Sequence, residues 1–247
     1  MSSIVEKSFG ELFKYVRIVA NPIKKAIIVT ECQIHKFINT QALEILENDN
    51  FTDASSFFSD YIIHLNKGVT WADQDLKSMG HFYNPFIGRG LYGNKSALTL
   101  GEEYYEKALQ EWKAGNVESS MFYLGAAIHL VQDMTVPQHV NIRLLDNHKQ
   151  YETFIKRSYL QSSEFMVHKG GYYYMRFINE AITCNARNAI KIFGKLKTIE
   201  DETKRFHTIT KFILPLAQRS TAGCLLMFYR DNAKQNIHSR RIKPIAP

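Results

Sequence analysis

The apolar residues of this chain recur every three to four positions along most of its length, and this spacing is the strongest constraint on its fold. In an α-helix, residues three and four apart share a face, whereas a half-buried strand would alternate apolar and polar residues. The pattern predicts long helical segments at residues 35–46, 100–112, 117–134, 151–165, 177–193 and 209–229. The fold class is therefore predicted as all-α, a single compact multi-helix bundle.

Glycine, proline and polar residues fall between these segments, as is typical of connecting loops. The predicted loops cover residues 48–56, 80–96, 113–116, 137–149 and 167–174. No internal repeat or low-complexity tract divides the chain, so one domain is predicted at residues 32–231. Residues 1–31 are expected to form a helical extension packed on or near the core, and residues 232–247 a basic tail. No apolar run reaches the length of about eighteen residues that a membrane-spanning helix needs.

The composition, with 45% hydrophobic and 22% charged residues, is that of a globular protein and excludes an intrinsically disordered chain. The net charge of +7 favours anionic partners, such as lipid head groups or nucleic acid, without choosing between them. The three cysteines, Cys32, Cys184 and Cys224, are too few and too far apart for a disulfide framework. The fold must therefore rest on packing, with or without a bound metal.

The segment IHLVQDMTVPQHV, residues 128–140, places three metal-binding types of side chain in a mostly apolar stretch. His129 and Asp133 are four residues apart, so on a helix they project from one face and can bind the same metal ion. For an isolated HxxxD pair, a histidine hydrogen-bonded to the carboxylate one turn away is the more common explanation. Pro137 disfavours a continued helix, so the chain can turn and bring His139 back toward the same face.

A second pair follows in NHKQYETF, where His148 and Glu152 are again four residues apart. Each pair alone has a structural explanation, but five such side chains around one turn favour a polynuclear metal site. Imidazoles mixed with carboxylates suit zinc better than calcium or magnesium, and the lack of clustered cysteines argues against a zinc finger. Further candidates lie upstream at His35, Asp73 and His81, and each taken singly also fits a helix surface, a helix cap or a loop hydrogen bond.

These motifs together resemble the zinc-dependent phospholipases C of the bacterial phosphatidylcholine-hydrolysing and alpha-toxin type, which are distantly similar to S1/P1 nucleases. The resemblance is strongest in FYLGAAIHLVQDMTVPQHV and NHKQYETF. It extends upstream through HKFINTQALEIL, GVTWAD and HFY, and downstream to AQRSTAGCLLMFY. It therefore covers roughly residues 32–229, and the ordered set His, Asp, His, HxxxD, His, HxxxE is highly specific.

The resemblance implies a three-zinc cluster whose protein ligands are all histidines or acids. The implied ligands are His35, Asp73, His81, His129, Asp133, His139, His148 and Glu152. Asp73, His81, His129 and Asp133 would bind one zinc, with Asp133 bridging to a neighbouring ion. Asp73 is also the candidate general base toward the attacking water, a role that the resemblance leaves open.

The second zinc would be bound by His139, His148 and Glu152, and the third by His35 together with Asp133. In secreted members of the family an N-terminal Trp completes the third site, whereas here 34 residues precede His35 and none of them is Trp. Two zinc ions are therefore expected, and the third site is filled differently, is weak or is empty.

Two other features differ from the choline-hydrolysing relatives or invite more than one interpretation. Cys32 could supply a thiolate near the third site, although a buried core thiol is the more common explanation. Gln74 and Ser78 stand where those relatives carry aromatic residues, which weakens any aromatic cage for choline. Four aromatic residues could line the entrance of the head-group pocket instead, or pack inside the protein: Phe82, Tyr83, Phe86 and Tyr92.

The function implied is hydrolysis of a glycerophospholipid by metal-activated water, which yields diacylglycerol and a phosphorylated head group. One alternative is an S1/P1-like nuclease or other phosphodiesterase, which the net charge of +7 would also suit. The other is a catalytically weak, zinc-stabilised membrane-binding module. Phospholipid at a membrane surface is the expected partner, with nucleic acid less favoured. Because no signal peptide is evident, the expected location is the cytoplasm or the inner membrane surface, with secretion as the alternative.

Overall fold

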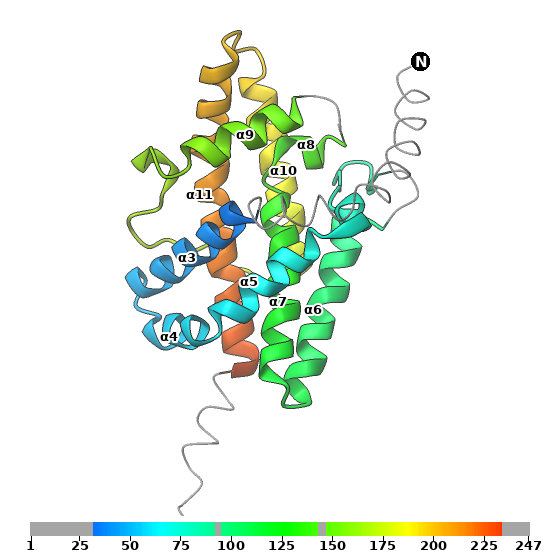
Figure 1. Cartoon of the computed structure of the whole chain (residues 1–247), viewed down its shortest axis with the longest axis vertical. Coiled ribbons are helices and arrows are strands. Elements are labelled where there is room, and N and C mark those ends of the chain that lie inside the picture. Colours follow the sequence, from blue (N-terminus) through cyan, green and yellow to red (C-terminus); the bar gives the residue numbers. More distant parts are fainter. Residues whose placement is uncertain (1–31, 92–94, 143–146, 234–247) are drawn as a thin grey trace, which may run out of the picture.

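The computed structural model describes residues 32–91, 95–142 and 147–233, and these residues are mainly helical (Figure 1). The α-helices are α3 (Gln33–Asn48), α4 (Thr52–Asp60), α5 (Ile62–Ala72), α6 (Ala97–Lys113), α7 (Val117–Asp133), α8 (Pro137–Val140), α9 (His148–Ser158), α10 (Ile178–Leu196) and α11 (Glu202–Phe228). Shorter helices of other types are η1 (Asp75–Gly80), η2 (Ser163–Phe165) and η3 (Tyr229–Ala233). The described residues contain no strand, only an isolated antiparallel bridge between Asn84 and Arg89. The predicted all-α fold is confirmed.

The long predicted segments correspond to α3, α6, α7, α9, α10 and α11, with ends shifted by a few residues. The predicted loop at 48–56 is partly wrong, because α4 begins at Thr52. This helix is short and buries only Ala54, Ser55 and Phe58, so its apolar periodicity is weak. The predicted loop at 137–149 likewise contains the single turn of α8, and the segment predicted to end at 165 stops at Ser158.

The predictions for the two chain ends lie mostly outside the described residues. The helical extension at 1–31 and the tail at 234–247 fall there entirely. The helical structure continues slightly beyond the predicted domain boundary, because η3 includes Asn232 and Ala233. Among the helices that the structure describes, none combines the length and apolar character needed to cross a membrane.

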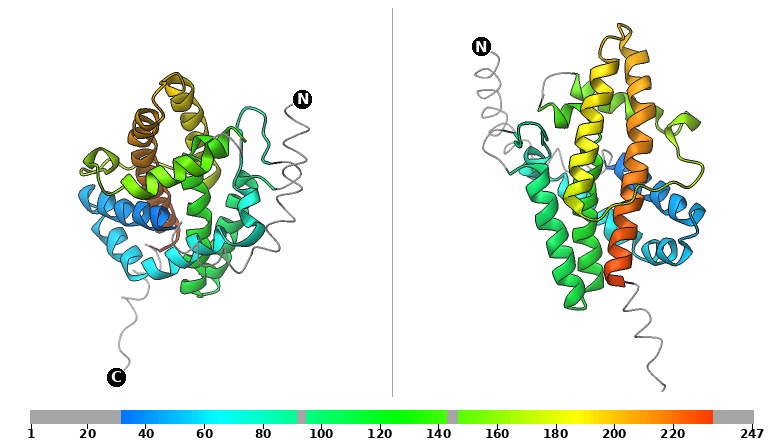
Figure 2. Two further views of the ribbon diagram at one scale, coloured as in Figure 1. Left: turned by 45° about the horizontal axis from the view of Figure 1, so that its top comes forward. Right: turned by 180° about the vertical axis from the view of Figure 1, so that it is seen from behind.

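Helix α7 lies inside the bundle and is contacted by α5, α6, α10 and α11 (Figures 1 and 2). Every residue of α7 from Leu124 to Asp133 is buried, as expected for a helix that is apolar on all sides. Seen from behind, α10 and α11 run side by side along the bundle (Figure 2). The three polar residues His129, Gln132 and Asp133 are therefore held in the interior of the protein at the C-terminal end of α7.

Three helix ends meet at this position. Helix α7 ends at Asp133, α5 ends just before Asp73, and α3 begins just before His35. Pro137 is the first residue of α8, and Val136 before it is extended, so the chain reverses after α7. This reversal places His139 beside the end of α7, as the sequence predicted.

Candidate metal centre

Asp133 is surrounded by four histidines that come from different parts of the chain. Its Oδ2 atom lies 2.8 Å from His81 Nδ1 and 3.2 Å from His129 Nε2. The same oxygen lies 3.4 Å from His139 Nδ1, and the Oδ1 atom lies 3.6 Å from His35 Nε2. The rings of His35 and His129 are stacked, with centroids 4.2 Å apart. Five predicted metal ligands thus share one buried location.

The environment of Asp133 fits a divalent cation better than a hydrogen-bond network. Within the described part of the chain, its buried Oδ2 has no partner in hydrogen-bond geometry, although three ring nitrogens surround it. A buried carboxylate oxygen without a hydrogen bond is destabilising unless another group compensates it. Ligand atoms on one tetrahedral zinc are about 3.3 Å apart, given bonds of about 2.0–2.2 Å. The separations from Asp133 Oδ2 to His81 Nδ1 and His129 Nε2, 2.8 and 3.2 Å, are close to that spacing.

Two sets of ligand atoms converge among the described side chains. One set is His35, His129 and Asp133, and the other is Asp73, His81 and His129. Within each set the ligand atoms all lie within 4.8 Å of one another. Because His129 belongs to both sets, they mark adjacent positions in one cluster rather than two separate sites.

Backbone carbonyl groups determine which nitrogen atoms of two histidines are free to bind a metal. His81 Nε2 donates to the carbonyl oxygen of Ala72 at 3.1 Å, and His139 Nδ1 donates to the carbonyl oxygen of His81 at 3.2 Å. A neutral imidazole carries one N–H, so the other nitrogen keeps its lone pair. The lone pair of His81 is therefore on Nδ1, the atom that faces Asp133.

A chain of buried amides fixes His35 in the same way. Gln132 Nε2 donates to Asn39 Oδ1 at 2.9 Å and to Thr221 Oγ1 at 3.1 Å, which orients its amide. Asn39 in turn donates to Asn66 Oδ1 at 2.9 Å. Gln132 Oε1 must then accept from His35 Nδ1, 2.8 Å away, so that Nε2 of His35 keeps its lone pair toward Asp133. Gln132 was not among the residues predicted from the sequence, although an amide within the apolar stretch LVQD is a recognisable signal.

Replacing Gln132 by Leu removes the hydrogen bond that orients His35, so we expect metal affinity to fall. Groups that orient a metal-binding histidine typically contribute about 10- to 100-fold to affinity. Competition with a chromophoric chelator measures this loss, and urea unfolding of the metal-free protein measures the accompanying loss of buried hydrogen bonds.

Asn185→Leu is the matched control, because Asn185 is also a buried amide. Its Nδ2 donates to the carbonyl of Val131 and to Ser220 Oγ, each at 2.9 Å, but to no predicted ligand. This control should lower the free energy of unfolding and leave metal affinity unchanged. Equal loss of affinity in both variants would contradict a specific role of Gln132 in orienting His35.

Burial and neighbouring charges shift the pKa values of several side chains in the cluster. Burial, together with the nearby His129, lowers the pKa of His35 to about 4, and burial also lowers the pKa of His129. Burial opposes ionisation of Asp133, but His129 and His139 outweigh it and hold its pKa well below the usual range. The pKa of Asp73, in contrast, is raised by burial. At neutral pH these shifts favour neutral imidazoles at His35 and His129 beside an ionised Asp133, whereas burial of His139 is outweighed by the charge of Asp133, which raises the pKa of that imidazole.

The ligand set predicted for a second zinc is only partly described. Helix α9 begins at His148, but the side chain of His148 lies outside the described part of the structure. Burial is the main cause of the raised pKa of Asp73, and Asp133 outweighs burial to raise the pKa of His139; the charge of Glu152 adds a smaller contribution to both. Metal binding by His139, His148 and Glu152 stays a prediction.

Cys32 is buried beside the cluster, with Sγ 4.0 Å from Asp73 Oδ2. Burial, followed by the charge of Asp73, raises the pKa of its thiol to about 12. A neutral thiol is a weak hydrogen-bond donor rather than a metal ligand. The structure therefore favours the packing interpretation of Cys32.

The aromatic residues considered for the entrance divide between packing and exposure. Phe82 and Tyr83 are buried, and Phe82 stacks on the ring of His139 with centroids 5.0 Å apart. Phe86 is 70% exposed. Tyr92 lies outside the described residues. Phe82 thus packs against the ring of the candidate ligand His139 rather than lining an opening.

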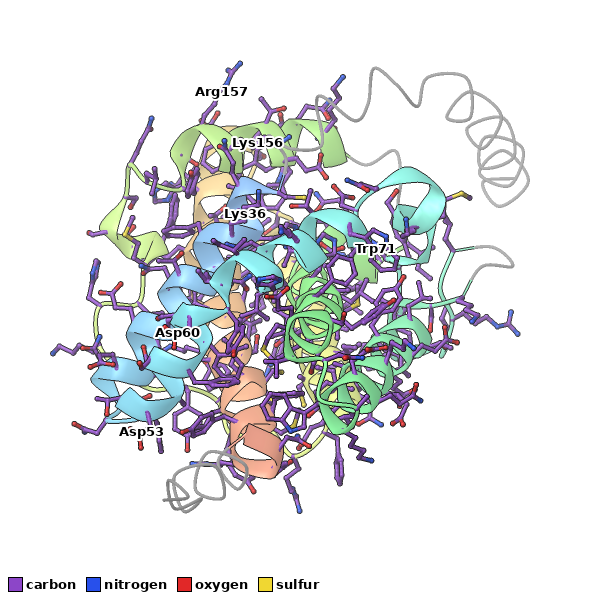
Figure 3. All side chains as sticks on the ribbon, turned by 60° about the horizontal axis from the view of Figure 1, so that its bottom comes forward. Lys36, Asp53, Asp60, Trp71, Lys156 and Arg157 are labelled. Atoms are coloured by element: carbon purple, nitrogen blue, oxygen red, sulfur yellow. The ribbon has the colours of Figure 1, made fainter. Side chains whose placement is uncertain are left out.

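An open groove of about 620 Å³ lies between α9 and the beginning of α11, and its lining includes Lys149, Thr153, Arg157 and Glu202. Figure 3 shows Lys156 and Arg157 on α9, which passes beside the beginning of α3, where Lys36 lies. None of the residues that line this groove is a predicted ligand. The groove is therefore distinct from the cluster around Asp133.

The sequence matches the family described as zinc dependent phospholipase C over residues 34–210. It is 25% identical over 235 residues to a phospholipase C of Clostridium novyi, and this alignment covers 81% of this chain and 59% of that protein. It is 30% identical over 144 residues to a phospholipase C of Clostridium perfringens, covering 49% of this chain and 36% of that protein. The alpha toxin of Clostridium absonum superposes with a TM-score of 0.71 at 20% identity, covering 81% of this chain and 64% of the toxin.

The structural likeness to the toxin shows a shared fold. The chain spans about 59% of the length of the Clostridium novyi protein that it matches. The family match, however, includes most of this chain and every predicted ligand from His35 to Glu152. The chain belongs to the zinc dependent phospholipase C family.

Proposed function

We propose that this protein is a zinc-dependent phosphodiester hydrolase that splits a glycerophospholipid into diacylglycerol and a phosphorylated head group. The observation that carries the proposal is the buried Asp133 carboxylate with four histidine nitrogens 2.8–3.6 Å away. Membership of the zinc dependent phospholipase C family supports zinc as the ion and a phospholipid as the substrate.

The proposal includes at least two zinc ions. Asp73, His81 and His129 would hold one of them, because their ligand atoms converge. A second would be held by His139 and Glu152 together with His148. His35 and Asp133, whose ligand atoms also converge, support a third ion, and the amide chain through Gln132 supports His35 as its ligand.

When bound, zinc supplies positive charge for the phosphate oxygens and makes water more acidic. Asp73 is the proposed base: it follows the last residue of α5 and is less buried than Asp133. Its raised pKa lets it accept a proton nearer to neutral pH than an ordinary aspartate. His81 and His139 are held by carbonyl groups, so their rings need no reorientation during the reaction.

Hydrolysis assays on the zinc-loaded full chain test this function. We expect phosphomonoester release from phosphatidylcholine or phosphatidylethanolamine, abolished by a chelator and restored by zinc. Asp73→Asn should lower turnover by about 10²–10⁴-fold if Asp73 is the base. Because Asp73 is also a proposed zinc ligand, the zinc content of the variant is measured beside its turnover, and a turnover loss larger than the zinc loss assigns the role of base.

The same assays separate the other functions. Cleavage of single-stranded DNA without release of lipid phosphomonoester would assign a nuclease instead. Tight zinc binding without turnover of any phosphodiester would assign a membrane-binding module. Either result would overturn the proposed lipid hydrolysis.

A further inference from the structure

Phe86 and Ile87 are adjacent large apolar residues that are 70% and 61% exposed. They lie at the tip of a turn formed by residues 84–89, which we call the apolar turn. A Cβ atom added at Gly88 would meet no atom within 4 Å, so this part of the turn is open to solvent. Exposed apolar side chains that lie together commonly mark a contact surface for a membrane or another protein.

The apolar turn is internally hydrogen-bonded. The backbone N–H of Asn84 donates to the carbonyl of Arg89 at 2.8 Å, and that of Gly88 donates to the carbonyl of Asn84 at 2.9 Å. The N–H of Phe86 also donates to Asn84 Oδ1 at 3.0 Å. The two apolar side chains are thus held outward by an ordered backbone, which lowers the entropy lost when they bind.

The base of the apolar turn is joined directly to the candidate metal centre. Tyr83 N–H donates to the carbonyl of His139 at 3.3 Å, and His139 Nδ1 donates to the carbonyl of His81 at 3.2 Å. Phe86 follows His81 by five residues. Five residues span at most about 18 Å, so a lipid reached by the turn is near the cluster.

The charge near the apolar turn suits phosphate head groups. Residues 81–95 contain Arg89 and Lys95 and no acidic residue. Lys95 pairs with Glu103, whereas Arg89 is exposed on the apolar turn itself. A cation beside two exposed apolar side chains matches the boundary of a bilayer, where phosphates lie above the acyl chains.

A second exposed aromatic group lies far from the cluster. Tyr173 and Tyr174 are 43% and 64% exposed, on a segment whose Tyr172 N–H donates to Asp49 at 2.9 Å. Asp49 follows the last residue of α3, fourteen residues after His35, which corresponds to about 20 Å along a helix. The apolar turn is therefore the better placed of the two groups to deliver a lipid to the cluster.

We propose that the apolar turn inserts into a phospholipid bilayer, with Phe86 and Ile87 at the acyl boundary and Arg89 at the phosphates. The proposal rests on the proposed function, because a lipid hydrolase must bring its cluster to a membrane surface. It adds a specific membrane-binding element to that function.

Tryptophan fluorescence tests insertion without requiring turnover. Phe86→Trp and Ile63→Trp are each made in the full chain, freed of metal, and mixed with vesicles of phosphatidylcholine and phosphatidylglycerol. Ile63 is the matched control, because it is 64% exposed but lies on α5. After subtraction of the wild-type signal from Trp71 and Trp112, Phe86→Trp should show a blue shift and quenching by brominated lipid, and Ile63→Trp should show neither.

Binding and hydrolysis provide a second readout. The double substitution Phe86→Ser with Ile87→Ser should weaken vesicle binding by about tenfold for each side chain. It should also lower the ratio of vesicle hydrolysis to hydrolysis of a monomeric short-chain phospholipid. Ile63→Ser should leave both quantities as in the wild type.

The outcomes separate the proposed insertion from the proposed function. A blue shift without any hydrolysis would support insertion and contradict the enzyme. Hydrolysis of monomeric lipid without a blue shift at position 86 would support the enzyme and contradict insertion. Equal shifts at positions 63 and 86, or a dimer in lipid-free solution that the double substitution abolishes, would also contradict the bilayer as the partner.

Discussion

Zinc is expected to lose most of its stabilising effect on this protein once Asp133 is replaced by Asn. The carboxylate faces four histidine nitrogens, so the substitution removes the negative charge at the centre of the cluster while keeping its shape. Residues that only orient a metal ligand contribute about 10- to 100-fold to affinity. Because Asp133 is itself a proposed ligand, we expect zinc affinity to fall on the order of 100-fold or more. Catalytic efficiency should fall on the order of 1,000-fold, which corresponds to about 4 kcal/mol of lost transition-state stabilisation.

Thermal unfolding with and without zinc measures this effect. At a zinc concentration of about 100 times the wild-type Kd, binding stabilises the native state by about 2.7 kcal/mol. A variant with 100-fold weaker affinity would gain only about 0.4 kcal/mol, so the zinc-dependent rise in Tm should be smaller by roughly 5–9 °C.

Glu118→Gln is the control for Asp133→Asn, because Glu118 also lies near a histidine, with His64 Nε2 at 3.9 Å. That pair is on the surface and includes no predicted ligand, so the control should keep the full zinc effect. An Asp133→Asn protein that zinc stabilises as strongly as the wild type would show that the ion binds elsewhere.

Local spacing was enough to predict most of the fold and the centre of the candidate site. The apolar period located α7, and the four-residue spacing placed His129 and Asp133 on one face of it. Pro137 predicted the reversal that brings His139 to within 3.4 Å of Asp133. These features depend on neighbouring residues, which a sequence displays directly.

Features that depend on contacts between distant helices could not be predicted in this way. The amide of Gln132 is oriented by Asn39, which is 93 residues away in the chain. Its role toward His35 requires the relative positions of α3 and α7, which apolar periodicity does not give. Joining His35 and Asp73 to the cluster likewise depended on a family resemblance, because each alone fits an ordinary surface or capping residue.

Two helix glycines, Gly68 and Gly125, are a further example of a long-range feature. A sequence presents glycine inside a helix as a weakness of about 1 kcal/mol relative to alanine. In the structure, a Cβ atom on Gly68 of α5 would overlap the carbonyl oxygen of Phe122, and one on Gly125 of α7 would overlap that of Leu65. The glycines thus let the two backbones touch, and α5 and α7 lead to Asp73 and Asp133 respectively.

Gly125→Ala should therefore destabilise the protein strongly, because the obstacle is backbone that cannot rotate away. Overpacking of a core typically costs about 1–3 kcal/mol, and a clash between two helix backbones should cost at least about 3 kcal/mol. This corresponds to a fall in Tm of roughly 6–12 °C, measurable by circular dichroism on the metal-free protein.

Gly194→Ala is the matched control, since Gly194 is also inside a helix but an added Cβ would meet nothing within 4 Å. The control should be neutral or stabilising by up to about 1 kcal/mol, because alanine favours the helix. If Gly125→Ala proved as stable as the control, α5 and α7 would not be in backbone contact, and the distance between Asp73 and Asp133 would have to be set by other elements.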